Sequence, residues 1–220
     1  MRAKNIIINM LIVFVLFFLL LKPTVASENN ISKYPETIST LRELYKAEII
    51  ASKTYSAFAN KAMEEKYDGV ARLFSALRES ESVHARNFKS ILKEIGVTLG
   101  KFPEPDIKVR ATKQNLEFAL NVELSEIDTK YPGFIERIKP EGNEKALIAI
   151  TYAWKAEMQH RDLIKKMKSA LWLFFGKIVA KLKGADKYYV CQRCGSTVFK
   201  LPEQFCVICG SPVLMYKEIK

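Results

Sequence analysis

Apolar residues recur every three or four positions over two long stretches of the chain, which is the period of helices with one buried face. The first stretch, from about 40 to 96, contains two such helices separated by the turn EEKYDG. The second contains another two, about 112–138 and 143–168, separated by the turn KPEGN. The connection between the stretches, GVTLGKFPEPDIKVRA, has prolines and no helical period. The pattern predicts an all-α bundle of four helices arranged as two hairpins.

Local signals place some of the helix ends. Thr40–Glu43 resembles a capping box at the start of the first helix. Asp68 and Asn143 are predicted to cap the second and fourth helices, because short polar side chains bond to free backbone N–H groups there. The sequence Tyr131-Pro132-Gly133 is expected to break or kink the third helix near its end.

Polar residues interrupt the apolar stripes at matching places in the two hairpins. Each hairpin has a lone glutamate on its first helix and a Glu-x-x-His pair on its second, which together use the only two histidines of the chain. The residues are Glu48, Glu81 and His84 in the first hairpin and Glu123, Glu157 and His160 in the second. The chain therefore contains a divergent internal repeat.

The spacing of these residues indicates a pair of metal ions. Residues three apart share one face of a helix, so a carboxylate and an imidazole can reach the same ion. Carboxylates on a buried face are costly unless they are paired or bind metal, and no Lys or Arg lies on these stripes. The arrangement matches that of carboxylate-bridged di-iron bundles, and its donors suit iron or manganese. Half-exposed glutamates and core histidines are the alternative, but that coincidence would have to occur twice.

Glu126 is a candidate seventh ligand. It lies three positions after Glu123, on the same face of an α-helix, whereas the matching residue of the first hairpin is Ala51. The alternative is a glutamate that faces solvent.

All four cysteines lie after position 190, as two C-x2-C pairs that are each followed by glycine: Cys191, Cys194, Cys206 and Cys209. Glycine in that position lets backbone N–H groups approach the sulfurs. Four thiolates arranged in this way form a tetrahedral site for one iron or zinc ion, between which the spacing does not decide. Two local disulfides are the alternative in an exported protein.

The N-terminus predicts export. Residues 1–26 have a basic start, an apolar run from Ile6 to Leu21, and the small residues Thr24 and Ala26 where a signal peptidase would cut. An uncleaved membrane anchor is the alternative. In either case the body is expected to be periplasmic or otherwise to face the outside of the cytoplasmic membrane.

The chain is basic, with a formal net charge of +11. For an exported chain we interpret this charge as a solvated or membrane-facing helix surface, and we expect no nucleic-acid partner. The segment 171–184, LWLFFGKIVAKLKG, is apolar with interspersed lysines. It is predicted to pack on the bundle or a dimer mate, with contact to a membrane surface as the alternative.

Together these motifs resemble rubrerythrins, in which a ferritin-like di-iron bundle precedes a small rubredoxin-like β domain that binds metal. YKAEIIASKTYSAFANKA, ESVHA, NVELSEIDTKYPGF and KAEMQH resemble the four helices of the family, and YVCQRCG…CVICGSP resembles its rubredoxin-like end. The resemblance covers about 36–219. It implies a bundle at 36–170, a helical linker at 171–187 and a rubredoxin-like domain at 188–220, after the leader at 1–26.

The resemblance also implies a role for each site residue. Glu81 and Glu157 would bridge two irons, while Glu48 and Glu123 would each bind one of them. His160 would bind the iron held by Glu123. His84 and Glu126 would exchange on the other iron when its redox state changes. The family also has tyrosines that hydrogen-bond around the site; Tyr55 and Tyr131 match them, with ordinary core packing as the alternative.

The implied activity is that of a peroxidase that reduces hydrogen peroxide to water. Electrons would pass from one iron at the four cysteines to two non-haem irons in the bundle, with zinc as the alternative metal at the cysteines. In the head-to-tail homodimer of the family this transfer crosses between subunits. An exported member needs an electron-donor protein that the sequence does not identify. The alternatives are a ferroxidase that handles iron, and a structural or partner-binding protein with zinc at the cysteines.

Overall fold

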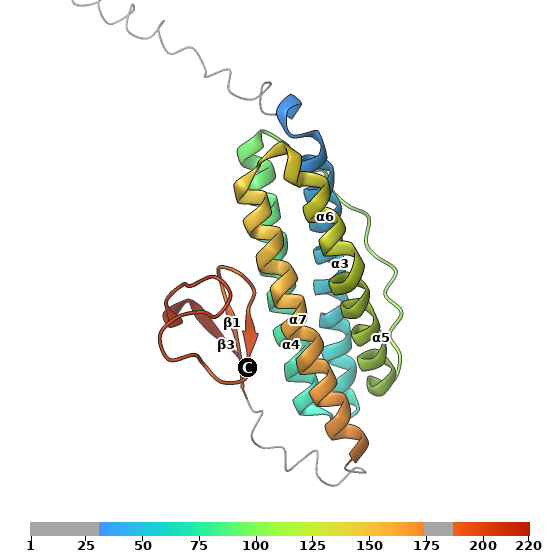
Figure 1. The fold of residues 1–220 in the computed structure, drawn as a ribbon. Helices are drawn as coiled ribbons and strands as arrows, with labels where there is room; N and C mark the ends of the chain where they lie inside the picture. Colours follow the sequence, from blue (N-terminus) through green and yellow to red (C-terminus); the bar gives the residue numbers. More distant parts are fainter. Residues whose placement is uncertain (1–30, 174–186) are drawn as a thin grey trace, which may run out of the picture.

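Four long helical segments lie side by side in the computed structural model, which describes residues 31–173 and 187–220 (Figure 1). The first hairpin consists of α3 (Pro35–Glu64) and α4 (Asp68–Ile95). The second consists of an interrupted helix followed by α7 (Glu144–Leu173). The predicted four-helix bundle is confirmed.

The third helical segment changes its geometry twice. It begins as α5 (Thr112–Ser125), continues as the π-helix η1 (Glu126–Lys130) and α6 (Tyr131–Ile138), and ends in the 3-10 turn η2 (Lys139–Glu141). At the Tyr131-Pro132-Gly133 sequence the helix changes from π to α geometry, since α6 begins at Tyr131, but the chain stays helical through it and a complete break is absent. The π-helix was not predicted, and it begins at Glu126, one of the predicted ligands.

Two of the three predicted helix caps are wrong. The first helix begins at Pro35, so Thr40 is buried inside it and does not cap it. Asp68 is the first residue of α4, which has no side-chain cap. The cap at Asn143 is confirmed, because its Oδ1 accepts a hydrogen bond from the backbone N–H of Ala146 at 3.1 Å.

The cysteine domain is a small antiparallel sheet with the strand order β2-β1-β3. Its elements are β1 (Tyr188–Cys191), β2 (Thr197–Val198), the 3-10 turn η3 (Val213–Met215) and β3 (Tyr216–Ile219). The domain lies beside α4 and α7, about halfway along the bundle (Figure 1).

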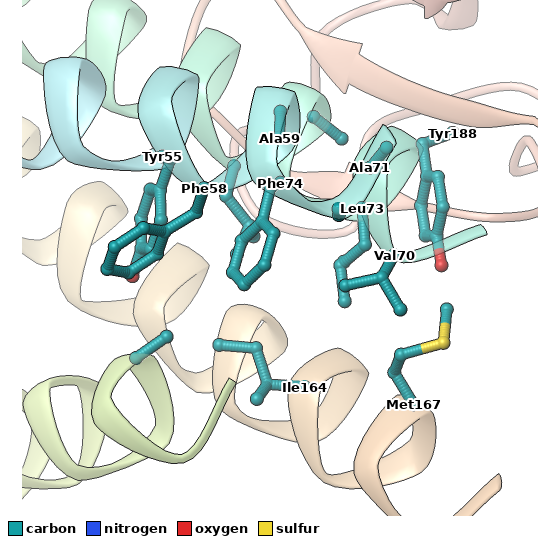
Figure 2. Close-up of a cluster of buried hydrophobic side chains, with 14 of the residues drawn as sticks. Tyr55, Phe58, Ala59, Val70, Ala71, Leu73, Phe74, Ile164, Met167 and Tyr188 are labelled. Atoms are coloured by element: carbon teal, nitrogen blue, oxygen red, sulfur yellow. The ribbon is translucent and has the colours of Figure 1, made fainter. Parts of the chain in front are cut away.

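Two apolar clusters fill the bundle. In one of them Tyr55 stacks on Phe74 at 5.8 Å between ring centroids, and Phe58 meets Phe74 edge-on at 5.4 Å (Figure 2). Tyr188 of the cysteine domain belongs to the same cluster, so burial of shared apolar surface holds the two domains together. The second cluster lies toward the other end of the helices. The polar residues of the predicted metal site fall between the two clusters on each helix.

Replacing Phe74 with alanine is expected to lower the free energy of unfolding by about 3–5 kcal/mol, since the ring is fully buried between two other aromatic rings. The measurement is chemical denaturation followed by helical circular dichroism. Phe118→Ala is the matched control, because that ring is 44% exposed and less packing is lost with it. Equal losses in the two variants would contradict this account of the core.

None of the helices in the described part of the chain is both long and apolar enough to span a membrane. The leader at 1–26 lies outside the described residues, as does nearly all of the predicted linker at 171–187. Export and membrane contact therefore stay predictions.

Candidate metal centres

Six buried side chains from four helical segments converge between the two apolar clusters. They form two overlapping sets, in each of which the potential ligand atoms lie within 4.8 Å of one another. One set is Glu48, Glu81, His84 and Glu157, and the other is Glu81, Glu123, Glu157 and His160. The sequence predicted these six residues as ligands, and the structure brings all of them together. Glu81 and Glu157 belong to both sets, which is the position that a bridging carboxylate needs.

The two shared carboxylates each present one oxygen to each histidine. His84 Nδ1 lies 3.1 Å from Glu81 Oε2 and 3.2 Å from Glu157 Oε1. His160 Nδ1 lies 3.3 Å from Glu81 Oε1 and 2.8 Å from Glu157 Oε2. The imidazole rings are stacked with their centroids 6.2 Å apart. The arrangement is close to two-fold symmetric, as expected from the internal repeat.

Two tyrosines connect the hairpins across this site. Tyr55 Oη donates a hydrogen bond to Glu123 Oε1 at 2.5 Å, and Tyr131 Oη donates one to Glu48 Oε1 at 2.7 Å. Each tyrosine thus supports the unshared glutamate of the opposite hairpin. Burial, reinforced by the negative glutamates, raises the pKa of both hydroxyls, so they remain protonated donors.

Burial governs the protonation of the cluster. It raises the pKa of Glu48 and of Glu123 well above the usual range. Burial alone would lower the pKa of His84, but the nearby carboxylates of Glu157 and Glu81 outweigh it and raise that pKa to about 10. Burial opposes ionisation of Glu157, yet the charge of His160 brings its pKa below the usual range. Without metal, protons on the histidines balance part of the carboxylate charge.

The residues present fit a pair of divalent metal ions. Three buried atoms in the cluster have no hydrogen-bond partner: Glu81 Oε2, His84 Nδ1 and Glu123 Oε2. Buried polar atoms without partners are costly, and all three belong to side chains of the ligand sets. Two divalent cations would match the four carboxylates in charge. A donor set rich in oxygen with one imidazole per ion favours iron or manganese.

Glu126 is the predicted ligand that the structure does not bring into either set. It opens the π-helix, and its carboxylate Oε1 accepts a hydrogen bond from Lys130 Nζ at 3.3 Å. It also lines a cavity of about 40 Å³ together with Glu48 and Tyr131. Burial, with the negative charge of Glu157 next in importance, raises the pKa of Glu126 to about 7.

The four cysteine sulfurs form a second centre. All are free thiols within 4.8 Å of one another, so the structure does not have the alternative pair of disulfides. Cys191 and Cys209 lie 3.7 Å apart at Sγ, and Cys194 and Cys206 3.5 Å. A tetrahedral ion with metal–sulfur bonds of about 2.3 Å requires about 3.8 Å between sulfurs, so the cluster fits a metal ion.

The cysteine domain forms hydrogen bonds with Nε2 of both histidines, the ring nitrogen that faces away from the carboxylates. His84 Nε2 lies 3.2 Å from the carbonyl oxygen of Cys194, and His160 Nε2 lies 3.2 Å from Thr197 Oγ1. Thr197 Oγ1 donates its own hydrogen to the carbonyl of Gly195, so it accepts from His160. Both imidazoles are therefore oriented with Nδ1 toward the carboxylates of the ligand sets, where a metal ion would bind.

Close approach of the domains depends on Gly195. Its φ is +80°, and a Cβ at this position would lie 2.2 Å from His84 Nε2. Ser80 Oγ donates a hydrogen bond to the carbonyl of Gly195 at 2.6 Å. Sequence reasoning missed Ser80 and Thr197, since these contacts join residues far apart in the chain; the glycine after the cysteine pair was the one available signal.

Comparison with known proteins identifies the family. The family model described as Rubrerythrin matches residues 40–168, more than half of the chain. The chain belongs to the rubrerythrin family. It is 29% identical to rubrerythrin-2 of Clostridium acetobutylicum over 182 residues, which cover 79% of this chain and 91% of that protein. It is 26% identical to nigerythrin of Nitratidesulfovibrio vulgaris over 197 residues, which cover 86% and 93%.

Solved structures agree with this assignment. Fully reduced, all-ferrous nigerythrin superposes with a TM-score of 0.69 at 26% identity, covering 83% of this chain and 86% of that one. A bacterioferritin from Desulfovibrio desulfuricans, at 19% identity and a TM-score of 0.64, shares the fold. The predicted ferritin-like bundle with a rubredoxin-like domain is confirmed. Family membership makes the chain an oxidoreductase of the di-iron class that is associated with oxidative stress.

Replacing Tyr131 with phenylalanine is expected to weaken iron binding in the bundle by about 10–100-fold, because Glu48 loses the donor that orients it. The measurement is competition for ferrous iron against a chelator. Tyr45→Phe is the control, since Tyr45 lies on the same helix as Glu48 but outside both ligand sets. Equal affinities in the two variants would show that Tyr131 only packs the core.

Proposed function

We propose that the chain reduces hydrogen peroxide to water, consuming two electrons and two protons for each peroxide. Iron supplies the electrons when bound, two at a time from the bundle pair to the O–O bond and one at a time from the cysteine site to the bundle. The supporting observation is the docking of the cysteine domain on both histidines of the candidate di-iron site. Simple iron storage has no use for such a contact.

The hydrogen bond between Cys194 and His84 provides the electron path. Cys194 would bind the cysteine iron through its sulfur, while its carbonyl oxygen lies 3.2 Å from His84 Nε2. One residue and one hydrogen bond therefore separate the thiolate from a histidine of the bundle site. In a head-to-tail homodimer this contact would lie between subunits instead of within one chain. The homodimer, the exported location and a separate electron-donor protein are also part of this proposal.

The cavity beside Glu48 gives peroxide a way in. Its volume of about 40 Å³ holds a molecule of a few heavy atoms, since one water needs about 10–15 Å³ on this measure. Glu126 lines the cavity, and burial raises the pKa of its carboxyl to about 7 in the metal-free protein, so it is placed to deliver a proton to a molecule in the cavity. Lys130 also lines the cavity, and its positive charge pairs with the Glu126 carboxylate when Glu126 is ionised.

The test is an anaerobic single turnover of the full chain. The protein is loaded with iron, reduced, and mixed with one equivalent of peroxide while the visible spectrum of the cysteine iron is followed. We expect about three irons per chain and rapid return of the ferric tetrathiolate colour. Cys209→Ser is the control, which should retain the bundle irons and lose the colour and steady turnover.

Three outcomes would contradict the proposal. Zinc at the cysteines of the protein isolated from its native host would remove the electron relay. If peroxide oxidised the cysteine iron no faster than it oxidises a tetrathiolate iron site without a bundle, the peroxidase activity would be ruled out. Faster oxidation by oxygen than by peroxide would favour a ferroxidase that handles iron.

A further inference from the structure

The side chain of Trp154 supplies a hydrogen bond to the backbone of the π-helix. Trp154 lies on α7, and its Nε1 donates to the carbonyl oxygen of Ile127 at 3.0 Å. Ile127 is buried and belongs to η1, the π-helix that begins at Glu126. We propose that Trp154 is a positioning residue, which holds this π-helix in place and thereby keeps the Glu126 carboxyl at the cavity beside Glu48.

Neither helical register gives the Ile127 carbonyl a backbone N–H partner. In an α-helix the donor would be the N–H of Tyr131, but that N–H donates to the carbonyl of Glu126 across the wider π turn. In a π-helix the donor would be the next residue, which is Pro132 and has no N–H. An unpaired carbonyl in a buried segment is costly, so a donor from another element stabilises the turn.

The indole favours the π turn over an ordinary α turn. If the chain continued as an α-helix, Pro132 would leave the carbonyl of Asp128 unpaired, and the proline ring would clash with it. In the π turn the unpaired carbonyl is that of Ile127 instead, and the Trp154 N–H satisfies it. Trp154 therefore stabilises the π form relative to the α form.

The helix that supplies the indole also carries a shared carboxylate of the candidate di-iron site. Trp154 lies three residues before Glu157, so the two side chains share one face of α7, which packs beside η1. The hydrogen bond to Ile127 fixes the backbone next to Glu126 relative to that face. The helix α7 thus places both the shared carboxylate and the carboxyl that lines the cavity.

The first hairpin provides an internal comparison. In the internal repeat, Ser52 matches Ile127 and Arg78 matches Trp154. The bond there runs in the opposite direction, from Ser52 Oγ to the carbonyl of Arg78 at 3.2 Å. The helix α3 is α-helical throughout and has its one proline in the first turn, so its carbonyls need no outside donor at this point. The indole donor thus occurs in the hairpin whose backbone lacks one.

The first test measures hydrogen exchange of the backbone over residues 126–131 in the full chain, which requires no turnover. Trp154→Phe removes the indole N–H and retains an aromatic ring at a half-buried position, so the bundle should stay folded. We expect exchange in this segment to be about tenfold faster, because the π turn loses a hydrogen bond. Ser52→Ala is the matched control, since it removes the corresponding bond of the first hairpin and should leave the segment unchanged.

A second substitution distinguishes positioning from loss of packing. Pro132→Ala returns an N–H to the backbone, so the Ile127 carbonyl no longer depends on the indole. In this background Trp154→Phe should change the exchange of the segment by less than about twofold. The ring volume lost is the same in both backgrounds. Equal acceleration in the two, or no acceleration when Pro132 is present, would overturn the proposal.

The second test asks whether Trp154 acts through Glu126, and it rests on the proton delivery proposed for that carboxyl. The reduced, iron-loaded chain is mixed with peroxide, and separately with oxygen, while oxidation of the bundle irons is followed. Trp154→Phe should slow the faster of the two reactions at least about tenfold, and should have no further effect in a Glu126→Gln background. Equal slowing in both backgrounds would overturn the positioning role. A wild type that oxygen oxidises faster than peroxide would contradict the peroxidase alone, and the variants would then be compared with oxygen.

Discussion

Replacing Glu157 with glutamine is expected to lower peroxide turnover by more than about 100-fold and to reduce the iron content of the bundle below two per chain. Glu157 faces His84 with Oε1 and His160 with Oε2, at 3.2 and 2.8 Å. Glutamine keeps the shape of the side chain but offers one oxygen and one NH2 group. At one of the two candidate iron positions an NH2 group, which donates hydrogen bonds, would then replace the oxygen that would bind the metal.

The measurement is steady-state peroxide reduction with an artificial donor, together with an iron count and the spectrum of the cysteine site. Glu117→Gln is the matched control, since Glu117 is exposed and forms only a surface ion pair with Lys168. The cysteine spectrum should be unchanged in both variants, which would show that the protein is folded. If Glu157→Gln reduced peroxide at a rate within threefold of the wild type, the shared carboxylate of Glu157 would not be needed for the reaction.

The two hairpins and the ligand sets were predictable because they depend on local periodicity. Glu81 and His84 share a helix face whatever surrounds them, since three residues on an α-helix bring side chains together. The repetition of this pair at Glu157 and His160 made chance improbable. The structure adds that Glu81 and Glu157 occur in both sets, a position that spacing alone could not give.

Glu126 shows where periodicity gives only part of the answer. Glu126 lines the cavity beside Glu48, as an inward-facing residue would, but a π-helix begins at Glu126 and its carboxylate lies outside both ligand sets. An extra residue in one turn changes the face that every following side chain occupies. The Pro132 that follows signalled an irregularity, but it did not indicate its form or its exact place.

The domain contacts were unpredictable for a different reason. Ser80 and Thr197 are ordinary polar residues in the sequence, and each acquires its significance from a partner on another element. No local pattern contains that information. Tertiary packing of the cysteine domain on α4 and α7 decides it, through the apolar contacts of Tyr188 as well as through hydrogen bonds.

Removal of metal from the bundle is expected to lower the free energy of unfolding by about 4 kcal/mol for each ion, at a free metal concentration a thousandfold above its dissociation constant. The cost arises because buried carboxylates lose the cations that match their charge. The size of the loss should depend on pH, since protons on the same side chains partly replace the metal.

The direction of that dependence follows from the pKa shifts. His84 has a folded pKa raised to about 10, so its protonation stabilises the metal-free fold fully below pH 6.5, and this contribution disappears as the pH rises toward 10. The raised pKa values of Glu48 and Glu123 act in the same direction above about pH 4.5. Glu157 acts oppositely, because its pKa is lowered and its contribution is lost only as the pH falls below the usual range. The metal-free protein should therefore be most stable near pH 5–6 and weaken toward pH 8.

The stability that bound metal adds to the fold should increase with pH, over the range in which the metal-free fold weakens. Binding two ions displaces protons from at least the two histidines, and each proton released changes the binding free energy by about 1.4 kcal/mol per pH unit. The gap between the melting temperatures of the metal-bound and metal-free forms should therefore widen from pH 6 to pH 8. Calorimetry in a Cys209→Ser background restricts the comparison to the bundle site. A gap that is constant or narrows over this range would mean that metal binding releases no protons between pH 6 and pH 8, so that neither the histidines nor the buried glutamates hold a proton in the metal-free fold.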